Sequence, residues 1–111
     1  MELKPWGSYT NILDEEYTKV KKVVIKSGQS PSYQYHFKRS EIWIIVKGNA
    51  DVRIDDVIKK YTVGDVIRID KEQKHQPINS GDEDLVFVEL QLGEYFGEDD
   101  IVRLEDKYGR V

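Results

Sequence analysis

The sequence contains no cysteine, which excludes disulfide bonds and thiolate ligands, so any metal ion would be held by nitrogen and oxygen donors. It has no apolar run long enough to cross a membrane, and its first residues lack the apolar segment of a signal peptide. Lys and Arg residues are scattered along the chain and the formal net charge is −4, which argues against a nucleic-acid partner. These absences predict a soluble cytoplasmic protein that has no membrane partner.

The 111 residues are enough for one domain with one core. From Tyr17 to Leu92, short alternating apolar and polar stretches are separated by Gly, Pro, Asn and Asp residues, and none has a helical pattern. This pattern predicts an all-β sandwich or barrel. We expect a single domain over residues 1–111, with a tail at 93–111 that folds over the barrel mouth. The acidic residues 98–100 leave a single helical turn open as an alternative.

Four polar residues are spaced like metal ligands. Gln34 and His36 lie two residues apart, so on a strand their side chains leave the same face. Glu41 follows after a short polar turn, and His75 is the only other histidine in the chain. Two imidazoles, a carboxylate and an amide oxygen suit zinc, the preferred candidate, or manganese, nickel, cobalt or iron. The alternative is a hydrogen-bonded polar cluster that binds no metal.

Both polar stretches resemble the two sequence motifs of the cupin superfamily, which implies a double-stranded β-helix, or jelly-roll barrel. In the second motif, Asp70 and Glu72 replace a usual Pro and Gly, and in the first motif Gln34 replaces a usual His. Positions of the two motifs that the chain retains are Gly28, His36, Glu41, Gly48, Gly64, His75 and Asn79.

The resemblance is narrower at three places. The opening Lys-Pro-Trp-Gly-Ser-Tyr, the stretch from Gln34 to Trp43, and the acidic tail from Gly93 to Arg110 resemble the C-terminal cupin domain of type II mannose-6-phosphate isomerases. That domain is commonly fused behind a guanylyltransferase domain, and here it is expected to be free-standing. The resemblance implies a metal-dependent isomerase that interconverts mannose 6-phosphate and fructose 6-phosphate through a cis-enediol.

The implied reaction needs a base and a cation for the phosphate. Glu89 is the proposed base, with Glu98 or Asp99 as rivals, and Arg103 is the second residue assigned to catalysis. Arg39, Lys38 and Gln91 are the expected substrate-binding residues, because a guanidinium matches a phosphate and Gln91 shares a strand face with Glu89.

Departures from the family pattern keep other functions open. Phe37, Lys38 and Ile42 stand where the family usually has histidines. They favour an alternative in which a non-catalytic cupin binds a sugar phosphate or a nucleotide sugar as a regulatory module. A third possibility is another metal-dependent cupin enzyme, such as an oxygenase. A homodimer is also expected, because Tyr33, Tyr35 and Phe37 alternate on one face of an edge strand.

Overall fold

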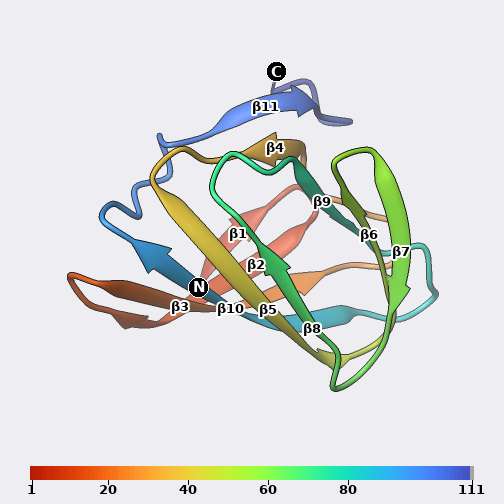
Figure 1. Cartoon of the computed structure of the whole chain (residues 1–111). Coiled ribbons are helices and arrows are strands. Elements are labelled where there is room, and N and C mark those ends of the chain that lie inside the picture. The colour runs from red at the N-terminus through yellow and green to blue at the C-terminus, as the bar shows by residue number, and fades with distance from the viewer. Residues whose placement is uncertain (111) are drawn as a thin grey trace.

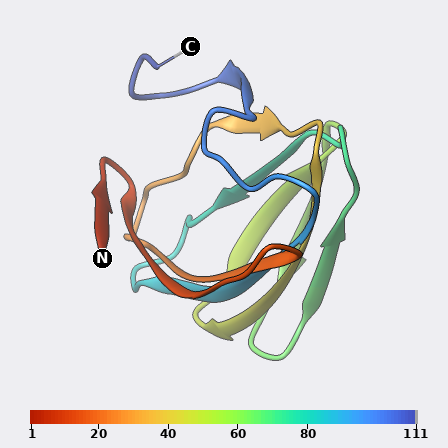
Figure 2. The same cartoon turned by 90° about the vertical axis from the view of Figure 1, so that its left-hand side faces the viewer.

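The computed structural model describes residues 1–110, which form two antiparallel β-sheets that face each other (Figures 1 and 2). The first sheet has six strands in the order β1-β2-β3-β10-β5-β8. Their bounds are β1 Glu2–Lys4, β2 Gly7–Asp14, β3 Thr18–Ile25, β5 Arg39–Lys47, β8 Val66–Ile69 and β10 Leu85–Gly93.

The second sheet has five strands in the order β11-β4-β9-β6-β7. It carries the C-terminal strand β11 at one edge, beside β4 (Figure 1). Within residues 1–110 there is no helix, and therefore none that could span a membrane. The bounds are β4 Tyr33–Tyr35, β6 Ala50–Ile54, β7 Val57–Tyr61, β9 His75–Ile78 and β11 Val102–Glu105.

The core lies between the two sheets and follows from the alternation of the sequence. In β5 and β10 every second side chain is buried, as expected when one face of a strand meets the opposite sheet. Trp43 of β5 stacks on Phe87 of β10 with 4.8 Å between the ring centroids. The same inward face of these two strands then continues into buried polar residues at one end of the barrel, at Glu41, Glu89 and Gln91.

The turns match their sequence signals. Asp55 and Asp56 both have positive φ, at 47° and 69°, and join β6 to β7 with Ile54 opposite Val57. Two central residues with positive φ are typical of a tight hairpin whose twist matches that of its strands. The sequence did not predict β1, β2 or β11. Strands β1 and β11 lie at sheet edges, and β2 lies between β1 and β3.

The expected exposed aromatic face is wrong at Tyr33. This side chain is buried, because the guanidinium of Arg53 stacks 3.8 Å from its ring centroid and its hydroxyl bonds to Asp56. Phe37 is exposed and meets the edge of the Tyr35 ring. The aromatic stripe on which the homodimer prediction depended is therefore shorter than expected, and the homodimer stays a prediction.

Gly48 is required at the turn before β6. It has a φ of +82°, and a Cβ there would lie 2.7 Å from the carbonyl oxygen of Asp84, which cannot move independently of its strand connection. We therefore expect Gly48→Ala to lower the free energy of unfolding by about 2–3 kcal/mol in urea titrations. Gly64→Ala is the matched control, because Gly64 has a φ of +91° but nothing within 4 Å of a Cβ. Equal losses in the two variants would contradict the steric argument.

Candidate functional site

Three buried residues from separate strands meet at one end of the barrel. His36 directly follows β4, Glu41 lies in β5, and His75 begins β9. One potential ligand atom from each lies within 4.8 Å of the other two. The Oε2 atom of Glu41 is 3.4 Å from Nε2 of His36, and its Oε1 atom is 3.9 Å from Nε2 of His75. We call these three residues the polar triad.

Backbone carbonyls fix both imidazoles of the polar triad. The Nδ1 atom of His36 lies 2.5 Å from the carbonyl oxygen of Asp100, and Nδ1 of His75 lies 2.9 Å from that of Gln73. A carbonyl only accepts, so each Nδ1 carries the hydrogen and each Nε2 keeps a lone pair. Burial lowers the pKa of His36 and so favours the neutral imidazole that binds metals.

Glu41 is the anion of the polar triad. Burial alone would raise its pKa, but the charges of His75, Arg39 and His36 and a hydrogen bond from Trp43 outweigh this effect and lower the pKa to about 2. The Trp43 indole donates to Oε1 at 2.9 Å, and Nε of Arg39 donates to Oε2 at 3.0 Å. An ionised carboxylate between two oriented imidazoles is a donor set that fits a divalent metal ion.

The structure places Gln34, the fourth expected ligand, beside the polar triad. It lies in β4 directly opposite His75 of β9, and its side chain lines the adjoining cavity. Its amide oxygen accepts a long 3.4 Å hydrogen bond from Ser32. Its role as a metal ligand stays a prediction.

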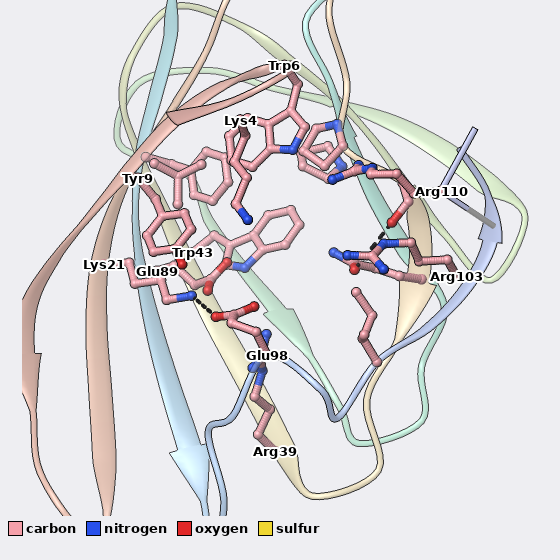
Figure 3. Close-up of a pocket in the computed structure, with 17 residues that line it drawn as sticks. Lys4, Trp6, Tyr9, Lys21, Arg39, Trp43, Glu89, Glu98, Arg103 and Arg110 are labelled. Carbon is pink, nitrogen blue, oxygen red and sulfur yellow. Dashed lines mark hydrogen bonds and ion pairs between the residues drawn. The ribbon is translucent and has the colours of Figure 1, made fainter. Parts of the chain in front are cut away.

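A cavity of about 660 Å³, counted out to its open mouth, lies next to the polar triad. His36, Glu41 and His75 do not line it themselves, but Arg39 and Trp43, which both donate to Glu41, do. Figure 3 shows Lys21, Glu89 and Glu98 on one side of it, Arg103 and Arg110 on the other, and Lys4 between them. The aromatic lining of the cavity consists of Trp6, Tyr9, Trp43 and Phe87.

Positive charge dominates the cavity lining. Five side chains are Lys or Arg and two are Glu. Among residues 1–110, the buried Nε of Arg103 and Nη1 of Arg39 have no hydrogen-bond partner. Lys21 is buried, forms an ion pair with Glu98, and lies 4.1 Å from the ring centroid of Tyr9.

Glu89 lies on the cavity wall, with Gln91 beside it. The Gln91 amide donates to Oε2 of Glu89 at 2.6 Å. Burial, together with the charge of Glu41, raises the pKa of Glu89 to about 8, although Lys21 and Arg39 act in the opposite direction. The carboxyl group is therefore largely protonated at neutral pH. Gln91 is fully buried and is not among the residues that line the cavity.

The structure brings most of the expected site residues together, but not Lys38. Its amine lies 4.9 Å from the ring centroid of Tyr95, and its side chain is exposed. The backbone amides of Phe37 and Lys38 donate to the buried carboxylate of Asp100, which anchors the tail beside His36. Arg39 and Arg103 both line the cavity, as does Glu98, whereas Asp99 pairs with Tyr95 outside it.

Sequence reasoning missed several polar or aromatic lining residues, among them Lys4, Tyr9, Lys21 and Arg110. Lys21 had a signal, because it shares the inward face of β3 with Val23 and Ile25. Tyr9 and Lys4 had no such signal in the sequence, because β1 and β2 were not predicted. Arg110 lies in the tail, where nothing in the local pattern indicates which side chains turn inward.

The chain is similar to proteins that are named as enzymes. It is 42% identical over 107 residues to a mannose-1-phosphate guanylyltransferase of Salmonella montevideo, a match that covers 96% of this chain and 23% of that protein. It is 41% identical over 108 residues to the alginate biosynthesis protein AlgA of Pseudomonas aeruginosa, covering 97% of this chain and 22% of that protein. The chain thus spans less than a quarter of the length of these relatives.

These relatives correct the functional prediction. They are named as guanylyltransferases and polysaccharide biosynthesis proteins, not as isomerases, so the prediction of a catalytic mannose-6-phosphate isomerase is not supported and is wrong as a main conclusion. The residues at the family's usual histidine positions agree with this correction. Phe37 and Ile42 have no group that could transfer a proton, and Lys38 does not line the cavity. The alternative, a non-catalytic cupin, fits better.

Solved structures confirm the predicted all-β cupin fold. A double-stranded β-helix protein from Klebsiella pneumoniae superposes with a TM-score of 0.78 at 20% identity, covering 89% of this chain and 84% of that one. The capsular polysaccharide assembling protein CapF of Staphylococcus aureus gives 0.77 at 26% identity, covering 95% of this chain and 34% of that one.

The family assignment accounts for the barrel, the two histidines at cupin ligand positions and the acidic tail together. The family model described as mannose-6-phosphate isomerase C-terminal matches residues 2–106, nearly the whole chain. The family is named after an isomerase, whereas the relative from Salmonella montevideo is named as a guanylyltransferase. The chain belongs to the mannose-6-phosphate isomerase C-terminal family of cupin domains.

Proposed function

We propose that this domain binds a sugar phosphate or a nucleotide sugar in the barrel cavity without converting it, and acts as a regulatory module. The observation that carries the proposal is the buried Nε of Arg103, which lines the cavity and has no hydrogen-bond partner in the described part of the chain. A buried donor without a partner is costly, and a bound oxyanion would satisfy it. The relatives' name, mannose-1-phosphate guanylyltransferase, includes a sugar phosphate.

The charge of the cavity supports an anionic ligand. Glu89 is protonated near neutral pH, and Glu98 is paired with Lys21, Arg110 with Asp106 and Arg39 with Glu41. Within residues 1–110, Arg103 and Lys4 are therefore the cavity cations without a carboxylate partner. Arginine is well suited to phosphate because its planar guanidinium donates two parallel hydrogen bonds. Arg103 therefore provides a site for a phosphate group at the side of the cavity that lies away from Lys21, with Lys4 between the two sides (Figure 3).

The aromatic lining supports a sugar or a base next to that phosphate. Trp6 and Tyr9 come from the N-terminal segment, and Trp43 comes from β5, so apolar ring surface faces the cavity from two directions. Aromatic faces combine a large apolar area with few rotatable bonds, which suits them to binding rings. Inorganic phosphate would gain nothing from these surfaces.

The polar triad would hold a divalent metal in this proposal. His36, His75 and Glu41 supply the two nitrogens and one oxygen typical of zinc sites that retain an open position, and manganese, nickel, cobalt or iron suit the same donors. Gln34 lies close enough in the fold to be considered as a fourth ligand. When bound, the ion would provide positive charge and a coordination position at the inner end of the cavity.

Titration calorimetry tests the binding function. Mannose 1-phosphate or a guanosine diphosphate sugar is expected to bind wild-type protein more tightly than inorganic phosphate does. Arg103→Gln should weaken sugar-phosphate binding by about tenfold to a hundredfold, because a charged hydrogen bond contributes roughly 1.5–3 kcal/mol.

Arg68→Gln is the matched control for this experiment. Arg68 is exposed on β8 and is not among the cavity-lining residues, so its loss should leave the affinity within twofold of wild type. Absence of binding by every sugar phosphate and nucleotide sugar at millimolar concentration would refute the proposed function. Equal weakening by both variants would show that general charge, and not the cavity arginine, is responsible.

A further inference from the structure

Arg39 contacts two of the three residues of the polar triad. It is the first residue of β5, and its side chain points to the same face as Glu41 and Trp43, two and four residues further along the strand. Its guanidinium is buried, with Nε donating to Oε2 of Glu41 at 3.0 Å and Nη2 lying 3.2 Å from Nε2 of His36. In this structure, the positive charge next to Glu41 and His36 is therefore the guanidinium of Arg39.

The guanidinium uses the lone pair that a metal ion would need. Nδ1 of His36 carries the hydrogen that is donated to the Asp100 carbonyl, so Nε2 has a single lone pair, and Nη2 of Arg39 donates to it. A nitrogen lone pair cannot bind a metal ion and accept this hydrogen bond at once. His75 differs, because its buried Nε2 has no partner among residues 1–110.

We infer that a divalent metal ion and the Arg39 guanidinium exchange at the polar triad, so that metal binding moves Arg39 into the cavity as an anion-binding group. The metal would take Nε2 of His36 and the carboxylate of Glu41, and His75 would complete the set. The anion-binding half of this inference rests on the proposed function, whereas the exchange itself does not.

The cavity is the side to which Arg39 can move. Its side chain already lines the cavity, and its Nη1 is buried there without a partner. The charge of Glu98 acts favourably on Arg39 from the cavity wall. Ionised Glu41 and Arg39 balance each other before metal binds, so a divalent ion leaves two uncompensated positive charges in a buried site. A phosphate group in the cavity would offset them and accept from the released guanidinium.

Heteronuclear NMR of the wild-type protein tests the exchange without any sugar phosphate. The Nε–Hε signal of Arg39, assigned through bonds from its backbone, is expected to be protected from solvent in the metal-free protein because of its bond to Glu41. One equivalent of zinc should shift this signal strongly or remove it by solvent exchange, while the His36 and His75 imidazole signals also shift. Imidazole shifts with an unchanged Arg39 signal would overturn the inference.

Zinc affinity provides the second test. Arg39→Leu removes the competing guanidinium, and this variant is expected to bind zinc at least tenfold more tightly than wild type. Arg68→Gln removes an exposed arginine of β8 that does not line the cavity, and should change zinc affinity by less than threefold. Failure of both wild type and Arg39→Leu to bind zinc would also overturn the inference, because no exchange could then occur.

A third measurement tests the coupling to the anion. Zinc should tighten mannose 1-phosphate binding by about tenfold, and mannose 1-phosphate should tighten zinc binding by the same factor, because coupling between two sites is reciprocal. In Arg39→Leu this coupling should fall to less than threefold. Undiminished coupling in that variant would mean that the phosphate binds zinc directly, and would overturn the role of Arg39. Absence of sugar-phosphate binding under all conditions would refute the proposed function. The NMR experiment would still decide whether the metal ion and the Arg39 guanidinium exchange.

Discussion

Replacing Glu41 by alanine is expected to lower the free energy of unfolding by about 3–5 kcal/mol in metal-free buffer at neutral pH. The carboxylate is 2% exposed, and within residues 1–110 it is the only ion-pair partner of the buried Arg39 guanidinium. Its removal leaves that cation buried without a counter-charge and also frees the indole N–H of Trp43. Urea unfolding followed by tryptophan fluorescence and by circular dichroism measures the loss.

A double variant separates the unpaired charge from lost packing. Arg39→Leu combined with Glu41→Ala removes both charges, so it should be more stable than Glu41→Ala alone by about 1–3 kcal/mol. The double-variant cycle then gives a favourable interaction between the two side chains. A loss below about 1 kcal/mol in Glu41→Ala, or strictly additive effects, would contradict the charge pairing described here.

The second large effect is a pH-dependent gain in stability in Glu89→Gln. The pKa of Glu89 is raised to about 8 from a usual 4.5, so between these values the unfolded chain loses its proton while the folded protein retains it. Wild-type stability should therefore fall as pH rises from about 5 to about 8, since the folded state binds more protons. A neutral amide has no such penalty and resembles the protonated carboxyl in shape.

Urea titrations of both proteins across this pH range measure the gain. The difference should be small near pH 5 and reach about 2–5 kcal/mol in favour of Glu89→Gln near pH 8.5. The effect of Glu41 falls in a separate window, because its pKa is lowered to about 2 and its contribution is lost only as pH falls below about 4.5. Glu83→Gln, at an exposed position, is the control and should show no pH-dependent gain. A variant at Glu89 that is less stable than wild type at pH 8.5 would disprove the buried neutral carboxyl.

The strands that build the core could be predicted because their side chains alternate. β5, β6, β8 and β10 each bury every second residue, and period-two alternation is visible in a single sequence. β2 and β11 could not be predicted in this way. Most of their residues are not buried, so the alternation is missing. β11 also depends on a partner far away in the sequence, β4.

The residues of the polar triad were predictable from motif spacing, but the state of the site was not. Arg39 was expected to bind phosphate, and nothing in its spacing shows that its guanidinium would lie on His36 and Glu41. In retrospect, alternation along β5 places Arg39 on the face of Glu41. Lys38 was expected to bind substrate, but its side chain is exposed. Strand alternation does not apply at residues 37–38, because the chain bends there and Asp100 of the tail accepts hydrogen bonds from both backbone amides.

Phosphorus NMR tests the central claim, that the cavity holds a sugar phosphate without converting it. Two samples of zinc-loaded protein would be followed over hours. One contains mannose 6-phosphate and the other contains mannose 1-phosphate, each at a concentration comparable to that of the protein. We predict that at least one phosphate signal shifts or broadens as protein is added, while no new signal appears in either sample. A growing signal of a second sugar phosphate would contradict the account, as would phosphate signals that remain unchanged in both samples.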